Sequence, residues 1–296
     1  MLDYKLIEAQ ALVAQGGGFD KAATALHITQ SAVSQRVKLL EEQMGQILVA
    51  RTAPPRLTSA GRNLLKHYLQ VKRPEDDLFG EMAQQVDQGY TPIAVALNAD
   101  SLATWFLDAI QSVVVKDGVL LDIRVDDQEQ THQLLKDGDV VGCISIKDQP
   151  LQGCRIDYLG QMNYHMFASP EFAKKCFPLG LTIADVCSAP AIIFNRKDEL
   201  HNKLCQLVLG QVPDSIPAHY VPSAEKFVDF IAMGLGYGML PRQQSEPFTG
   251  NGRLVDLAPD HNIPVKLYWH CWNLNSKLLV KFTRQLILGA KALLDA

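Results

Sequence analysis

The sequence lacks several features that would place it in familiar classes of protein. No apolar run approaches the roughly 18 residues that a membrane-spanning helix requires. The first residues, Met1 to Lys5, are not a basic segment followed by an apolar one, so no export signal is expected. The six cysteines are scattered without a CxxC pair, which disfavours a disulfide framework and a zinc site. We therefore expect a cytoplasmic protein with reduced thiols, no metal and no membrane contact.

Signatures of enzymatic sites are missing as well. The chain contains no GxSxG elbow, no HExxH motif, no GxxxxGK[ST] phosphate loop and no GxGxxG motif. The glycine-rich stretch Gly234–Gly238 precedes an expected strand, so a tight turn explains it better than a phosphate site does. We expect neither an enzyme nor a cofactor.

Length and charge indicate several domains with different partners. The 296 residues, 47% of them hydrophobic and 20% charged, are typical of a globular chain of two or three domains. The first 72 residues hold nine basic and five acidic residues, a net charge of +4. The remaining 224 hold 19 basic and 27 acidic residues, a net charge of −8. A basic segment ahead of an acidic body favours a polyanion as the first partner.

Hydrophobic spacing in the basic segment predicts three helices. The first ends at three glycines, residues 16–18, and the second covers about Phe19–Leu26. Thr29 is placed as the N-cap of the third helix, whose exposed stripe consists of Ser31, Ser34, Gln35 and Lys38. A short helix, a tight turn and a longer polar helix are typical of a helix-turn-helix, whose second helix enters the major groove. The alternative is an ordinary solvated helix face.

A proline-stiffened loop follows the third helix. Ile47–Val49 is predicted as a short strand, and residues 51–58 return from it with Arg51 and Arg56. A wing of this kind would bring both arginines to the DNA backbone or the minor groove. Thr58 is placed to cap the next helix.

The basic segment resembles the winged helix-turn-helix of LysR-type transcriptional regulators. The resemblance rests on the stretches Ala22–Leu26, Thr29–Glu41, Arg51–Thr52 and Leu57–Gly61. The form of residues 51–56 resembles one branch of that family, which responds to arginine and lysine. The residues expected to contact double-stranded promoter DNA are Thr29, Gln30, Ser31, Ser34, Gln35, Arg36, Lys38, Arg51, Arg56 and Thr58.

Residues 59–89 are predicted as a linker helix with an apolar heptad seam. The seam residues are Leu64, Tyr68, Val71, Leu78 and Met82. In LysR-type regulators this helix pairs with that of a second subunit, so the resemblance implies a homodimer or tetramer. The alternative is that the seam packs on the chain's own domains. Pro74 removes a helical hydrogen bond, so we expect a kink or a break near Arg73.

Residues 90–296 alternate predicted strands and helices, which favours an α/β fold with βαβ units. Expected strands cover residues 92–97, 121–125, 140–146, 163–168, 191–194, 218–221, 237–240 and 265–272, and one long helix is expected over 101–115. The resemblance implies a two-lobed effector domain similar to periplasmic binding proteins. The expected organisation is a winged helix-turn-helix over 1–58, a linker over 59–89 and an effector domain over 90–296. Lobe I is expected to comprise about 90–163 and 265–296, and lobe II about 164–264.

Ligands of such folds bind between the lobes, at the carboxyl ends of strands. Ser101 and Thr104 follow the first strand at a predicted helix N-terminus, where hydroxyl and N–H groups suit a carboxylate. The alternative for Ser101 is ordinary N-capping. A cationic amino acid also needs acidic partners, for which Asp126 and Glu225 are candidates, although a solvated loop or a helix-dipole role would explain them too. The residues expected to bind the effector are Asn98, Asp100, Ser101, Thr104, Trp105, Asp126, Ser145, Ser223 and Glu225.

The resemblance implies a DNA-binding regulator that senses a small molecule, lysine or arginine in the branch that the chain resembles. The effector would alter DNA geometry or contacts with RNA polymerase at genes for basic amino-acid export and metabolism. A LysR-type regulator of another metabolite and a mainly architectural DNA-binding protein are the alternatives. A stand-alone solute-binding protein would share the acidic body but not the basic segment.

Overall fold

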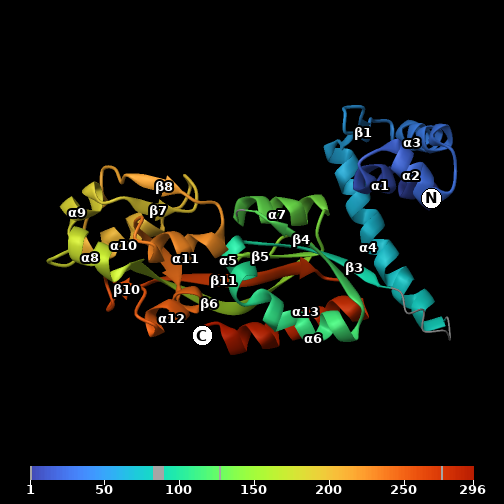
Figure 1. Ribbon diagram of the computed structural model, residues 1–296. Helices are drawn as coiled ribbons and strands as arrows, with labels where there is room; N and C mark the ends of the chain where they lie inside the picture. The colour runs from blue at the N-terminus through green and yellow to red at the C-terminus, as the bar shows by residue number, and fades with distance from the viewer. Residues whose placement is uncertain (1, 83–89, 127, 275) are drawn as a thin grey trace.

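The computed structural model describes residues 2–82, 90–126, 128–274 and 276–296. It consists of a small helical head, a long helix and an elongated α/β body (Figure 1). The head lies at one end of the molecule, and the body extends away from the long helix in two successive lobes (Figure 1).

The head is a winged helix-turn-helix, as the sequence predicted. Its helices are α1 (Tyr4–Gly16), α2 (Phe19–Leu26) and α3 (Gln30–Met44), and its wing pairs β1 (Val49–Ala50) with β2 (Arg56–Leu57) in antiparallel register. The predicted N-cap of α3 is confirmed, because the Thr29 hydroxyl accepts a hydrogen bond from the backbone N–H of Ala32. Gly45 ends α3 in the left-handed conformation, with φ of 68°.

The long helix α4 (Ser59–Met82) begins at a tight packing point of the head. The Thr58 hydroxyl accepts a hydrogen bond from Gly61 N at 3.1 Å, which confirms the predicted cap. Buried Gln10 of α1 donates from Nε2 to the Gly61 carbonyl oxygen at 2.8 Å. A Cβ on Gly61 would collide with the carbonyl oxygen of Leu48, so glycine is required here.

We expect Gly61→Ala to destabilise the head by about 1–3 kcal/mol, because the added methyl group must separate α4 from the backbone of residue 48. Differential scanning calorimetry of the full chain would record this as a lower melting temperature. Gly250→Ala is the matched control, since a Cβ there meets no atom within 4 Å. Equal melting temperatures of the two variants would contradict this account of the packing.

Of the kink or break expected near Arg73, the break is wrong, because the helix α4 continues through Pro74. Proline removes only the hydrogen bond to the carbonyl of the fourth residue before it, and the bonds of the neighbouring turns keep the helix continuous. Residues of the predicted heptad seam differ in their burial. Leu64 and Tyr68 are buried in the core of the head together with α1 and α3, whereas Leu78 is 53% exposed.

One mixed sheet runs through both lobes of the body, in the order β4-β3-β5-β11-β6-β9-β7-β8, with β10 beside β6. The strands are β3 (Thr91–Leu97), β4 (Val119–Val125), β5 (Gly142–Ser145), β6 (Cys154–Ala168), β7 (Ala191–Ile193), β8 (Ala218–Tyr220), β9 (Tyr237–Pro241), β10 (Val255–Asp256) and β11 (Ile263–Trp272). Parallel pairs form at each end, β3 with β4 and β5 in lobe I and β7 with β8 and β9 in lobe II. The antiparallel pair of β6 and β11 joins the lobes.

Helices cover both faces of this sheet. Lobe I carries α5 (Ala99–Thr104), α6 (Phe106–Lys116), α7 (Gln128–Asp137) and α13 (Lys277–Leu293), with α6 and α13 on one face and α7 on the other (Figure 1). Lobe II carries α8 (Pro170–Cys176), α9 (Ile183–Ser188), α10 (Leu200–Leu209), α11 (Ala224–Ala232) and α12 (Arg242–Gly250). The single helix expected over 101–115 is wrong, because the chain turns at Trp105 and buries its indole in the core.

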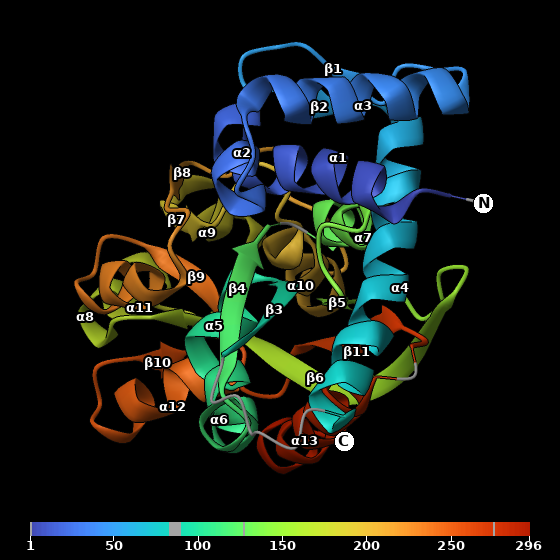
Figure 2. The same cartoon turned by 90° about the vertical axis from the view of Figure 1, so that its right-hand side faces the viewer.

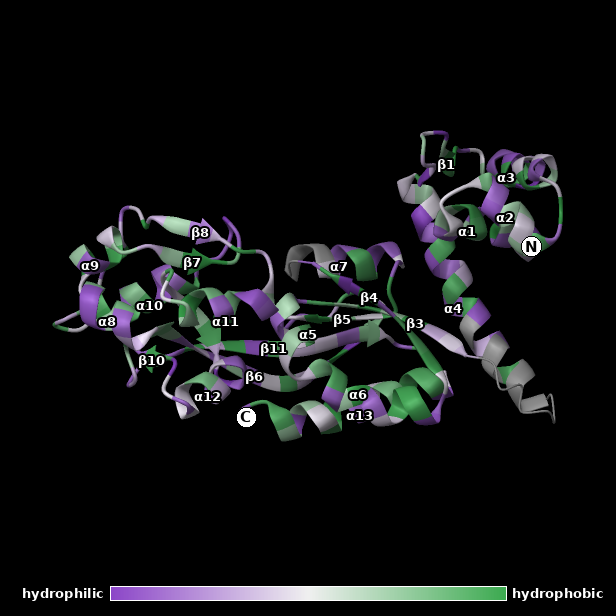
Figure 3. Cartoon of the chain, in the orientation of Figure 1, coloured by the Kyte–Doolittle hydropathy of each residue, from purple (hydrophilic) through white to green (hydrophobic). Residues whose placement is uncertain are grey.

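A continuous apolar core crosses from lobe I into lobe II. The same buried cluster contains Trp269 and Phe282 of lobe I and Tyr237 of lobe II. The central strands of lobe I are mainly hydrophobic, whereas the outer faces of the head and of lobe II carry many hydrophilic residues (Figure 3). Within the described residues, we find no helix that combines the length and apolar character needed to cross a bilayer.

Candidate DNA interface and effector cleft

An open groove lies between α3 and the wing. Figure 2 shows α3 and the wing on the side of the head that faces away from the body. Six residues expected to contact DNA line this groove, namely Gln30, Ser31, Ser34, Gln35, Lys38 and Arg51. Phe19, Thr52 and Pro55 complete the lining. Because the lining includes amide, hydroxyl and cationic side chains but no carboxylate, it suits hydrogen bonds to base edges and ion pairs with phosphates.

The other four residues expected to contact DNA lie outside the groove lining. Thr29 caps α3 and shares a hydrogen bond of 2.9 Å with the Ser31 hydroxyl. Arg36 is half-buried, and exposed Arg56 lines a different cavity, towards the body. The Thr58 hydroxyl donates to the carbonyl oxygen of Ile47 at 2.8 Å, so its hydrogen atom is used within the head.

Lys38 remains available to a phosphate despite one acidic neighbour. Its Nζ lies 3.7 Å from the Glu42 carboxylate, one helical turn away, and the two side chains are 69% and 61% exposed. Ion pairs with this exposure contribute little, because water and salt screen them. A DNA phosphate can therefore replace Glu42 as the partner of Lys38.

The second candidate site lies where β3 runs into α5. Asn98 Oδ1, Ser101 Oγ and Trp105 Nε1 are buried, and none has a hydrogen-bond partner among the described residues. Buried polar atoms without partners are unfavourable in a folded protein and need an explanation. Their concentration around one short helix indicates a place for a polar ligand.

A buried carboxyl group adjoins these atoms. Tyr164 of β6 donates a hydrogen bond of 2.6 Å to Asp100 Oδ2. Burial raises the pKa of Asp100, the Tyr164 hydrogen bond lowers it, and the charge of Asp198 raises it further. Asp198 precedes α10 in lobe II, so carboxyl groups of both lobes lie close enough to repel each other. A cationic ligand would relieve that repulsion.

The tyrosine keeps its proton in this arrangement. Burial raises the pKa of Tyr164 well above its usual value, and the charge of Asp100 and the hydrogen bond to it act in the same direction. The phenol therefore acts as a donor to Asp100 and ties α5 to a strand that joins the lobes.

Several predicted effector residues lie around this point. Asp126 is exposed, and its backbone N–H donates to the Leu97 carbonyl oxygen at 3.3 Å, which puts it next to Asn98. Ser145 is buried at the end of β5, and its hydroxyl accepts a hydrogen bond from Lys147 N at 3.2 Å.

Other predicted residues have local roles. Thr104 donates to the backbone carbonyl of Asp100 at 2.6 Å, within its own helix. Ser223 caps α11 by accepting a hydrogen bond from Lys226 N, and α11 packs against α5 across the cleft. Glu225 is exposed on the first turn of α11, away from the buried polar atoms of α5.

Sequence reasoning missed Tyr164 and Asp198. Tyr164 lies 64 residues from Asp100, in a strand whose pattern indicates only packing, so no sequence signal identified it. Asp198 follows the carboxyl end of parallel strand β7, where ligand-binding residues of α/β folds gather. Applying that rule to lobe II would have found it.

Comparisons with known proteins identify both regions. Residues 4–62 match the family described as bacterial regulatory helix-turn-helix protein, lysR family, and residues 115–286 match the LysR substrate binding domain. The HTH-type transcriptional regulator ArgP of Aeromonas salmonicida is 41% identical over 286 residues, which cover 97% of this chain and 96% of ArgP. ArgP of Pseudomonas aeruginosa is 41% identical over 292 residues, 98% of this chain and 96% of ArgP.

Solved structures agree with these matches. The crystal structure of ArgP from Mycobacterium tuberculosis is similar with a TM-score of 0.90 and 37% identity, and the match covers 100% of both chains. Full-length LysG from Corynebacterium glutamicum with bound effector Arg is similar with a TM-score of 0.81 and 30% identity, again over 100% of both chains.

This chain therefore belongs to the LysR family of bacterial transcriptional regulators, as its basic segment indicated. Within that family it is similar to ArgP over nearly its whole length. The family is not enzymatic, which agrees with the lack of enzymatic motifs in the sequence. The winged head and the two-lobed effector domain are both confirmed.

Proposed function

We propose that this regulator binds lysine or arginine between the lobes of its body and controls genes for basic amino-acid export and metabolism. The observation that carries the proposal is the carboxyl group of Asp100, hydrogen-bonded to Tyr164 beside buried polar atoms that lack partners among the described residues, with the negative charge of Asp198 from lobe II acting on it. Arginine bound to LysG, which is 30% identical to this chain, supports the same ligand class.

The two ends of a basic amino acid fit the two kinds of group in this cleft. Its ammonium or guanidinium group would bind the carboxylates of Asp100 and Asp198, where opposite charge offsets their repulsion. Its carboxylate would accept hydrogen bonds from Ser101 Oγ and Trp105 Nε1, which are buried donors without a partner among the described residues. A neutral side chain such as that of leucine would bring no positive charge to these two carboxylates.

The head would bind promoter DNA through the groove between α3 and the wing. We assign the base-edge contacts to Gln35 and Ser34, and the phosphate contacts to Lys38 and Arg51. The DNA contacts expected for Arg36 and Arg56, which lie outside the groove lining, remain part of the proposal. A response of transcription would follow from altered DNA geometry or from contact with RNA polymerase, and the site of action is the bacterial cytoplasm, where the DNA lies.

We further propose that the chain acts as a homodimer or tetramer, like other regulators that pair through this helix. Leu78 supports this, because it belongs to the heptad seam and is 53% exposed on α4. The functional division is a DNA-binding part over 1–58, a linker over 59–89 and an effector domain over 90–296. Lobe II would take about 164–264, and lobe I the remainder of the effector domain.

Calorimetric titration of the full chain with L-lysine, L-arginine and L-leucine tests the effector. We expect saturable heat from at least one basic amino acid and none from leucine, because only a cation pairs with the two carboxylates. A thermal-shift assay with the same amino acids serves as a second readout. Absence of heat and of any shift with both basic amino acids would reject the effector but leave the DNA-binding proposal standing.

A further inference from the structure

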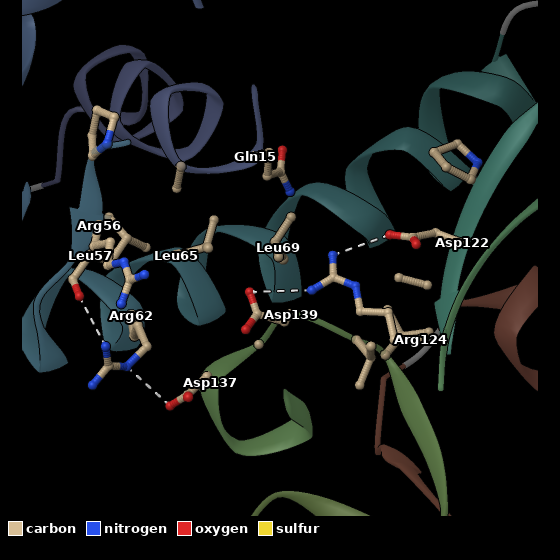
Figure 4. A pocket seen from close by; sticks show the side chains of 17 residues that line it. Gln15, Arg56, Leu57, Arg62, Leu65, Leu69, Asp122, Arg124, Asp137 and Asp139 are labelled. Carbon is tan, nitrogen blue, oxygen red and sulfur yellow. Dashed lines mark hydrogen bonds and ion pairs between the residues drawn. The ribbon is translucent and has the colours of Figure 1, made fainter. Parts of the chain in front are cut away.

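The head touches lobe I at an interface that lies apart from both candidate sites. Arg62 of α4 places its Nε 3.1 Å from Asp137 Oδ1, at the end of α7 (Figure 4). The same guanidinium donates from Nη1 to the carbonyl oxygen of Leu57 in the wing at 2.9 Å. One side chain therefore connects the wing with the effector domain.

Close packing accompanies this ion pair. Gly138, with φ of 82°, lies so near α4 that a Cβ on it would be 3.1 Å from Cα and Cβ of Lys66. Leu69 of α4 packs against the core of the head and also against the core of the body. The long helix is thus held by both domains at once, two turns beyond the ion pair.

The helix α7 joins this interface to the effector cleft. Its first turn follows Asp126, whose backbone is bonded to Leu97 beside the buried atoms of α5. Its last residue is Asp137, about 15 Å away along ten residues of helix. Between them, His132 packs on His270 of β11 with ring centroids 4.5 Å apart, which couples α7 to a strand that joins the lobes.

We propose that the contact of Asp137 and Gly138 with α4 is the surface through which the effector cleft controls the orientation of the DNA-binding head. A shift of Asp126 on ligand binding reaches Asp137 through α7, and Arg62 passes it to the wing. Effector and DNA affinities are then linked through this interface. The inference rests on the proposed effector function.

The test compares operator binding of full-length variants with and without L-arginine or L-lysine. The DNA is a fragment that the wild type selects from genomic DNA, and the quantity measured is the ratio of the two DNA affinities. We expect Asp137→Lys, which places a cation beside Arg62 and Lys66, to lower that ratio about threefold or more towards 1. Calorimetric affinity for the amino acid should stay within about twofold of the wild type, because the cleft is unchanged.

Two further variants make the result specific. Asp137→Glu keeps the negative charge opposite Arg62 and leaves the hydrogen bond from Arg62 to Leu57 in place, so it should keep the wild-type ratio within about twofold. Asp117→Asn is the matched control, because Asp117 pairs with Lys281 at 2.5 Å within lobe I and is buried to a similar degree as Asp137. If Asp137→Lys does not fold, Asp137→Asn replaces it in the same test, because it also removes the negative charge opposite Arg62.

The outcomes separate this inference from the function on which it rests. If the wild type binds neither amino acid, the proposed effector fails and this inference falls with it. If the wild type responds to the effector and Asp137→Lys responds equally, only the interface is rejected. An Asp117→Asn variant that loses the response as fully as Asp137→Lys, or an Asp137→Glu variant that loses it too, also overturns it.

Discussion

Asp100→Asn is expected to weaken the binding of lysine or arginine by about 2–5 kcal/mol, which is about 30-fold or more. The substitution removes the negative charge but keeps an oxygen that accepts the hydrogen bond from Tyr164, so α5 stays attached to β6. What is lost is the partner of the ligand's cation in a cleft where burial makes each charge matter more. Calorimetry measures the loss directly.

The same carboxyl group predicts a pH dependence. The pKa of Asp100 is raised, chiefly by burial, so the empty cleft holds a proton there at higher pH than an ordinary aspartate would. A cation binds the ionised form, and affinity should therefore fall as the pH is lowered, beginning at a higher pH than an ordinary aspartate would give. Asp100→Asn should lose this dependence.

Asp108→Asn is the control for both measurements, because Asp108 is exposed on α6 and its removal changes the net charge equally. Affinities of the two variants that agree at every pH would show that Asp100 takes no part in binding.

Gln35→Ala is expected to cost about 1–3 kcal/mol on the operator and almost nothing on unrelated DNA, because an amide reads base edges. Arg51→Ala should instead weaken binding to every sequence and reduce the slope of log affinity against log salt by about 1, since one phosphate contact is lost. Both residues line the same groove, so the two variants separate sequence reading from backbone contact.

Lys174→Ala controls for loss of a positive charge, because Lys174 is exposed on α8 of lobe II, outside the groove. Footprints and binding curves over a salt series would measure all three variants. A promoter footprint of Gln35→Ala that matches the wild type, with undiminished preference over unrelated DNA, would refute its base-reading role.

The head could be predicted almost completely from the sequence, because its signals are local. Thr29 caps the helix that it precedes, Gly45 ends the same helix, and the prolines after Arg51 turn the chain into the wing. Most strands of the body were also predicted from their apolar residues, but β10 and the first half of β6 were not.

The features that the sequence did not predict depend on contacts between residues far apart in the chain. The local cost of Pro74 predicted a break, but neighbouring turns and the packing of α4 on two cores outweigh one missing hydrogen bond. The helix predicted over residues 101–115 is interrupted at Trp105, because its indole ring packs in the core of lobe I. In the cleft, Asp100 was predicted from its loop, whereas Tyr164 and Asp198 come from a crossing strand and from the second lobe.

The division of α4 between two cores limits how this regulator can be recombined with others. Leu64, Leu65 and Tyr68 belong to the core of the head, so residues 1–58 transplanted onto another regulator would leave a large part of that core behind. If the transplanted segment were extended to include Leu69, that residue would meet a foreign body surface. A working hybrid would need the donor's helix through at least residue 69, together with a recipient loop that accepts Lys66 and Arg62. The boundary at which the DNA-binding head can be exchanged therefore lies within α4 and not between two domains.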